Sequence, residues 1–180
     1  MTPDLLAPLA LFALVTSVTP GPNNMMLLAS GANFGFRRSV PHMLGISLGH
    51  SVMVFLFGIG VAGIVSASAT AMAVLEGVSV VYMLWLAWKI AHAAAPGERQ
   101  AGGTPMTFLQ AAAFQWVNPK AWAMALTAVT VYVPQPSLAT AVIVALVFGA
   151  VNLPSVSIWT VIGQELRRIL TNPRRLGLFN

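Results

Sequence analysis

Two short stretches place polar, helix-breaking residues in the middle of long apolar segments. The first reads Thr19-Pro20-Gly21-Pro22-Asn23-Asn24 and the second reads Asn118-Pro119-Lys120. Proline lacks an N–H and its ring clashes with the carbonyl four residues earlier, so each stretch frees backbone groups from the helix. In hydrocarbon such groups persist only where they are buried in protein or face a watery cavity. The freed backbone is therefore the first candidate for chemistry.

The first stretch has the composition of a binding site for a small zwitterion. Pro22 suits the first position of a new helical segment. The N–H groups at the start of that segment, including those of Asn23 and Asn24, would carry the positive end of the helix dipole and bind a carboxylate. The side chains of Thr19, Asn23 and Asn24 suit an ammonium or hydroxyl group. The alternative is a simple proline kink with locally satisfied carbonyls; a matching break near residue 119 favours the binding site.

Three ionisable residues lie within apolar segments and are candidates for proton coupling: Lys120, His50 and Glu76. A charge inside the membrane is costly, so Lys120 is expected to pair with a substrate carboxylate or join a coupling step. The alternative for Lys120 is a side chain that snorkels towards the membrane surface or binds the freed carbonyls around Pro119. His50 suits a proton relay, although a neutral histidine bonded between helices is favoured. For Glu76, a role as a gate or proton site and simple hydration are equal alternatives.

Asn152 adds a polar position to the last apolar segment. Together with Ser155, Trp159 and Gly163 it follows a spacing of three, four and four residues, which places these side chains on one helical face. Asn152 is therefore predicted to contact substrate, while helix packing explains Ser155 and Gly163 equally well.

The composition predicts an all-α integral membrane protein with a single domain over residues 1–180. The chain is 57% hydrophobic and only 7% charged, with a mean hydropathy of +0.81. A soluble domain carries far more charge than this. A membrane-crossing helix needs about 20 apolar residues. Five spans are predicted, at residues 5–34, 41–64, 71–91, 107–132 and 138–163.

The cations predict the orientation. If the first loop is cytoplasmic, that side receives eight of the nine Lys and Arg residues: Arg37, Arg38, Lys89, Arg99, Arg167, Arg168, Arg174 and Arg175. The positive-inside rule then puts the N-terminus in the periplasm and the Arg-rich C-terminal tail in the cytoplasm. The basic tail is interpreted as a topology anchor near anionic lipid, and no nucleic-acid partner is expected.

The two breaks also suggest an internal repeat. They lie about 100 residues apart, as do Gly49 and Gly149, and their helices would cross in opposite directions. This is the pattern of an inverted-topology transporter repeat. We assign a first repeat to about 1–91, a loop to 92–106 and a second repeat to about 107–180. A sixth helix is expected from the repeat but is missing from the sequence.

Three stretches resemble the LysE/RhtB family of amino-acid exporters. They are Thr19-Pro20-Gly21-Pro22, then Phe114-Gln115-Trp116-Val117-Asn118-Pro119-Lys120, and the polar face that begins at Asn152. The resemblance implies a bacterial inner-membrane protein of about six helices that exports amino acids, driven by the proton gradient. It also implies that Pro20, Gly21, Pro22, Asn118, Pro119 and Lys120 line the transport path.

The favoured function is a secondary transporter that exports a neutral amino acid, such as threonine, homoserine or leucine. The two half-helix starts and Lys120 would hold the carboxylate, and no central acid is available for a dibasic substrate. The alternatives are a truncated, inactive or assembly-dependent membrane fragment and, with less support, a metal-ion exporter. The sequence has no cysteine and its histidines are far apart, so neither a metal site nor a cofactor is expected. No enzyme activity is expected, and a homodimer is left open.

Overall fold

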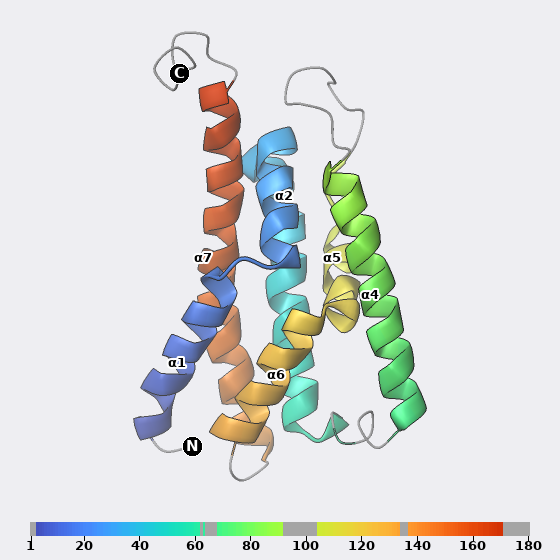
Figure 1. Ribbon diagram of the computed structural model, residues 1–180. Coiled ribbons are helices and arrows are strands. Elements are labelled where there is room, and N and C mark those ends of the chain that lie inside the picture. The colour runs from blue at the N-terminus through green and yellow to red at the C-terminus, as the bar shows by residue number, and fades with distance from the viewer. Residues whose placement is uncertain (1–2, 62, 64–67, 92–103, 134–136, 171–180) are drawn as a thin grey trace.

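All regular structure in the described part of the chain is helical (Figure 1). The computed structural model describes residues 3–61, 63, 68–91, 104–133 and 137–170. The elements are α1 (Pro3–Val18), α2 (Pro22–Gly58), α4 (Ala69–Ala91), α5 (Phe108–Phe114), the short 3-10 helix η1 (Gln115–Val117), α6 (Pro119–Tyr132) and α7 (Leu138–Leu170). The predicted positions of Arg99, Arg174 and Arg175 lie outside the described residues.

The long element α2 is a helical hairpin rather than one straight helix. Gly35, at φ 76° and ψ 170°, adopts a conformation that residues with a side chain rarely reach. The hydroxyl oxygens of Ser30 and Ser39 are 2.8 Å apart, whereas nine residues of straight helix span about 13 Å. The chain therefore reverses at Gly35, and α2 has a first arm at 22–34 and a second arm at 36–58. This confirms the predicted turn between the first two spans.

The breaks lie where the prolines predict them. α1 ends at Val18, and the first arm of α2 begins at Pro22 and continues in the same direction (Figure 1). η1 ends at Val117, and α6 begins at Pro119 and continues the course of α5 towards the opposite end of the molecule. Both breaks fall at mid-height of the bundle. The first and fourth predicted spans are thus each built from shorter helical pieces.

Only two stretches among the described residues qualify as membrane-crossing helices by length and hydropathy alone, Pro22–Gly58 and Leu138–Ile169. The reversal at Gly35 divides the first of these, while the second crosses the bundle without interruption (Figure 1). A shorter apolar helix covers Asp4–Val18. The prediction of five membrane-crossing helices is therefore matched in part.

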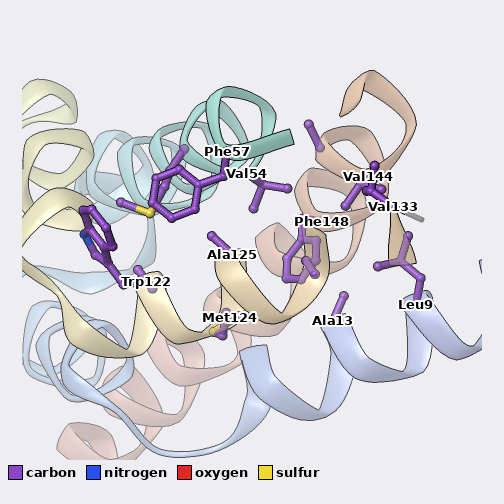
Figure 2. Close-up of a cluster of buried hydrophobic side chains, with 14 residues drawn as sticks. Leu9, Ala13, Val54, Phe57, Trp122, Met124, Ala125, Val133, Val144 and Phe148 are labelled. Carbon is purple, nitrogen blue, oxygen red and sulfur yellow. The ribbon is translucent and has the colours of Figure 1, made fainter. Parts of the chain in front are cut away.

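Two apolar cores lie on either side of the breaks. The lower core joins α1, the second arm of α2, α6 and the first half of α7. Figure 2 shows it and labels Leu9, Ala13, Val54, Phe57, Trp122, Met124, Ala125, Val133, Val144 and Phe148. The upper core joins both arms of α2 to α5 and α7 through Leu27, Met43, Ile46, Ala111 and Val156. The polar residues between these two cores are thereby held at a fixed depth.

A pair of glycines brings the first arm of α2 into backbone contact with α7. A Cβ on Gly31 would lie 2.0 Å from the carbonyl oxygen of Thr160, and a Cβ on Gly163 would lie 2.0 Å from that of Leu28. No side chain fits at either position, so these four residues form a glycine seam between the two helices.

The second arm of α2 packs against α5 in a similar way. A Cβ on Gly45 would lie 2.3 Å from the carbonyl oxygen of Phe108, and one on Gly49 would lie 2.6 Å from the Cα of Ala112. Gly45 and Gly49 thus form a close helix contact with α5. The packing holds the second break beside the first.

The described arginines gather at one end of the bundle. Arg37 and Arg38 follow the reversal of α2, and Arg167 and Arg168 lie in the last turns of α7, at the same end (Figure 1). Arg167 donates hydrogen bonds to two backbone carbonyls at the end of the first arm of α2, at 3.2 and 3.3 Å. This agrees with the segregation of charge seen in the sequence. Lys89 lies in α4, but its side chain is outside the described residues.

Candidate functional site

The two breaks meet through Lys120. Its ammonium nitrogen donates to the carbonyl oxygen of Thr19 at 2.6 Å, to the Thr19 hydroxyl at 3.0 Å and to the carbonyl oxygen of Pro20 at 3.4 Å. Lys120 is the second residue of α6, so the second break delivers a cation to the carbonyl end of α1. The negative end of the α1 dipole favours a cation there. Lys120 thus binds freed carbonyls of the first break, and not the carbonyls around Pro119 that its alternative interpretation named.

The other carbonyls at the end of α1 are bound by side chains from other helices. The amide of Asn24 donates to the carbonyl oxygens of Ser17, at 2.9 Å, and Thr19, at 2.7 Å. The indole N–H of Trp159 on α7 donates to the carbonyl of Val18 at 3.1 Å. Together with Lys120, side chains from α2, α6 and α7 thus satisfy the end of α1. An unsatisfied carbonyl here would cost several kcal/mol in a membrane.

The start of α2 is open, in contrast to the end of α1. Gly21 occupies the cap position in an extended conformation and provides no side-chain hydrogen bond. The first N–H groups of a helix have no intrahelical partner, so those of Asn23 and Asn24 are available to an anion. A Cβ on Gly21 would lie 2.7 Å from the Cδ of Lys120. Glycine therefore leaves both the helix start and the path of the Lys120 side chain free.

The start of α6 is closed. Asn118 caps it, with its side-chain oxygen accepting from the N–H of Lys120 at 3.1 Å. The preceding turn, η1, is fixed by a hydrogen bond from the Trp122 indole to the carbonyl of Trp116 at 3.0 Å. The expectation that both half-helix starts would hold the carboxylate therefore needs revision. Among the described breaks, the α2 start alone lacks a side-chain cap.

Gln115 is a site residue that the sequence analysis did not single out. Its amide pairs reciprocally with that of Asn23, at 2.9 and 3.2 Å, and also donates to the carbonyl of Ala111 at 2.8 Å. Its side chain is completely buried. This pair connects the two breaks directly. The available signal was a lone amide in an apolar run three residues before Asn118.

His50, on the second arm of α2, and Asn152, on α7, form the side of the site that we call the inner wall. Asn152 donates to the hydroxyl of Ser17 at 3.1 Å, while its carbonyl oxygen has no partner among the described residues. Both ring nitrogens of His50 also lack a partner there, and its ring packs against Phe148 with centroids 5.3 Å apart. The favoured interpretation of His50, a histidine hydrogen-bonded between helices, is wrong for the described contacts.

These residues surround one cavity between the two cores. Of the predicted binding residues, Gly21, Asn23, Asn24, Asn118, Lys120 and Asn152 line it, and so does His50. Thr19 and Pro20 contact the Lys120 ammonium, and Pro22 and Pro119 begin the two helices that follow the breaks. The free volume is about 20 Å³, room for about one water molecule.

The cavity lining contains one cationic side chain, that of Lys120, and no carboxylate. No group of three His, Cys, Asp or Glu residues in the described part of the chain is placed to hold a metal ion. Glu76 lies in α4, but its side chain is outside the described residues, so its predicted coupling role stays a prediction. The arrangement provides hydrogen-bond donors for a carboxylate and carbonyl oxygens for an ammonium group.

Comparison with known proteins identifies the family. Residues 14–176 match the LysE type translocator family. The cysteine/O-acetylserine efflux protein of Escherichia coli K12 is 31% identical over 171 residues, which cover 94% of this chain and 87% of the relative. The protein of the same name from Salmonella typhimurium LT2 is 37% identical over 134 residues, covering 74% and 68%. No solved structure matches the chain. The chain therefore belongs to the LysE type translocator family, as its motifs predicted, and is a membrane transport protein rather than an enzyme.

Proposed function

We propose that this protein exports a small neutral amino acid, of the cysteine or O-acetylserine type, across the bacterial inner membrane. The proposal is supported by the names of its relatives and by a cavity lining without a carboxylate. Cysteine and O-acetylserine belong to the same neutral class as the threonine and homoserine suggested by the sequence. A dibasic substrate would bring a second cation beside Lys120, with no acid in the lining to balance it.

The observation that carries the proposal is the open start of α2 beside Lys120. The substrate carboxylate would accept from the N–H groups of Asn23 and Asn24, where the helix dipole is positive. Its α-ammonium group would bind the carbonyl oxygens of Thr19 and Pro20, which hold the Lys120 ammonium in the absence of substrate. Lys120 would then turn to the carboxylate. Each charge of the zwitterion thus meets an opposite charge or dipole.

Loading requires the lining helices to separate, because the free volume holds about one water. In our proposal the chain is one transporter domain of two inverted repeats, about 1–91 and 107–180, that rock about the site. The opposite courses of the α1–α2 and α5–α6 breaks support this arrangement (Figure 1). The arginine-rich end would face the cytoplasm, the N-terminus the periplasm, and the proton gradient would drive export. A homodimer is compatible with this scheme.

Uptake into inverted membrane vesicles tests the proposal. A labelled amino-acid panel is offered with an imposed proton gradient, to the wild type and to Lys120→Ala. Neutral amino acids should accumulate, and Lys120→Ala should lower their uptake at least about tenfold, because a hydrogen bond to a charged group is lost. Arg168→Ala is the control, since Arg168 pairs with Glu165 at 2.6 Å on the exposed surface. Uptake of lysine alone, or an unaffected Lys120→Ala, would contradict the proposal.

A further inference from the structure

The inner wall of the cavity carries polar atoms that no protein group satisfies. His50 is 2% exposed and Asn152 is 5% exposed. Both nitrogens of His50 and the side-chain oxygen of Asn152 lack a hydrogen-bond partner among the described residues. The great majority of buried polar groups in proteins have a hydrogen-bond partner, so unpaired groups that line a cavity are candidates to bind a molecule that enters it. Both residues line the cavity.

His50 and Asn152 both line the cavity, and Phe148 relates their positions. The His50 ring packs edge-on against Phe148, with an interplanar angle of 70°. Asn152 follows Phe148 by one helical turn on α7, so the side chains of Phe148 and Asn152 lie on the same face of that helix. The Asn152 amide nitrogen is engaged by Ser17 at 3.1 Å, which leaves its oxygen as the free acceptor. The wall therefore offers one acceptor from Asn152, and one donor and one acceptor from a neutral imidazole.

Resting on the proposed function, we propose that His50 and Asn152 recognise the polar side chain of the exported amino acid. The carboxylate and ammonium groups are held at the first break, so the substrate side chain is the part left to meet this wall. A hydroxyl or thiol group can donate to the Asn152 oxygen and accept from the imidazole N–H, and an ester group can accept from the imidazole N–H. An apolar side chain of equal size leaves the wall atoms unpaired, which disfavours its binding. The two residues are thus the specificity determinants of the site.

His42 provides a matched control on the same helix arm. It is also 2% exposed, and both of its ring nitrogens lack a partner among the described residues. Unlike His50, it is not part of the cavity lining. Replacing either histidine by phenylalanine removes the same polar atoms from an equally buried place. A role in recognition predicts that only the His50 substitution changes the choice of substrate.

The experiment measures equilibrium binding to the full-length protein in detergent with two isosteric pairs, threonine against valine and cysteine against 2-aminobutyrate. The wild type and His42→Phe should prefer the polar member of each pair. His50→Phe and Asn152→Leu should lower this preference about tenfold, through loss of one buried hydrogen bond. His50→Gln, which keeps a donor and an acceptor, should retain part of the preference. Gel filtration checks that each variant is folded.

Several results would overturn the inference. One is an unchanged preference in folded His50→Phe, and another is an equal loss of both members of each pair. An equal shift in His42→Phe would show that burial, not recognition, sets the effect. If wild-type protein binds no amino acid at all, the proposed function fails as well. If it binds both members of each pair equally, the inference about the wall fails while the proposed function stands.

Discussion

The two helix breaks use similar residues but reach different structures. At the first, three residues separate α1 from α2, the helix start at Pro22 has no side-chain cap, and the freed carbonyls are bound by side chains from three other helices. At the second, η1 leads within one residue into α6, whose start is capped by Asn118. At the first break the carbonyls are bound but the helix start is uncapped, so this break is half open. At the second break the helix start is capped, so this break is closed.

The residue that precedes the first proline of each following helix, Pro22 or Pro119, explains this difference. Asparagine is among the strongest helix caps because its side-chain oxygen reaches the N–H groups of the first turn. Asn118 thus fills the site that an anion would otherwise take. Gly21 has no side chain, so the first N–H groups of α2 have no capping oxygen. A proline in a membrane helix creates free backbone groups, while the preceding residue decides whether those groups remain available to a ligand.

Asn24→Leu tests the bound carbonyls of the first break and should have the largest effect of the three changes described here. The substitution removes the donor to the carbonyls of Ser17 and Thr19. Loss of two partners at roughly 1–3 kcal/mol each, partly offset by water, should lower the free energy of unfolding by about 2–4 kcal/mol. Denaturant titration in detergent measures this. Asn33→Leu, at an exposed position of the same arm, should change it by less than about 0.5 kcal/mol. Equal effects of the two substitutions would contradict our account.

Gly21→Asn would give the first break the cap of the second. Substrate affinity should fall about tenfold, because the new side chain competes with the carboxylate for the helix start. Gly21→Ala is the matched control, since it adds the same Cβ near Lys120 Cδ but no capping oxygen. Titration of labelled substrate measures both variants. If alanine weakens binding as much as asparagine, the contact with Lys120 matters and the open start does not.

The Asn23–Gln115 pair tests whether the breaks are energetically coupled, with the smallest expected effect. Asn23→Leu alone leaves the amide oxygen of the buried Gln115 without this partner, and Gln115→Leu alone does the same to the partly buried amide of Asn23. The double substitution removes both amides. The double variant should therefore be more stable than the sum of the single effects predicts, by about 1 kcal/mol. A double-mutant cycle in detergent gives this coupling energy. Additive effects would mean that the pair contributes geometry without stability.

The sequence predicted the local features of the site and missed those that depend on distant residues. Proline acts on its own helix, so Pro20, Pro22 and Pro119 located both breaks without any tertiary information. The partners of the freed carbonyls come from far along the chain, as Trp159 does for Val18. Nothing in a single sequence pairs these residues. The same reason hid Gln115, whose partner is 92 residues away.

Lys120 is an example of a residue whose distant partners a single sequence does not reveal. Its cost in a membrane marked it as functional, and its charge was assigned to a substrate carboxylate. Its partners in the structure are the carbonyls of Thr19 and Pro20. The alternative drawn from the sequence was the carbonyls around Pro119, because a single sequence does not show which residues of the other half of the chain lie beside Lys120. The coupling roles of Lys120, His50 and Glu76 stay predictions.

The glycine seam between Gly31 and Gly163 has a mechanical consequence. Backbone touches backbone there, so the first arm of α2 and α7 have no side chains that could rearrange to let them slide. We expect these two helices to move together as one rigid body. α1 is joined to these two helices by the three residues of the first break and by the hydrogen bonds that Ser17 and Val18 accept from Asn24 and Trp159. A movement of α1 relative to α2 and α7 therefore has to break these hydrogen bonds, so the freed carbonyls resist such a movement.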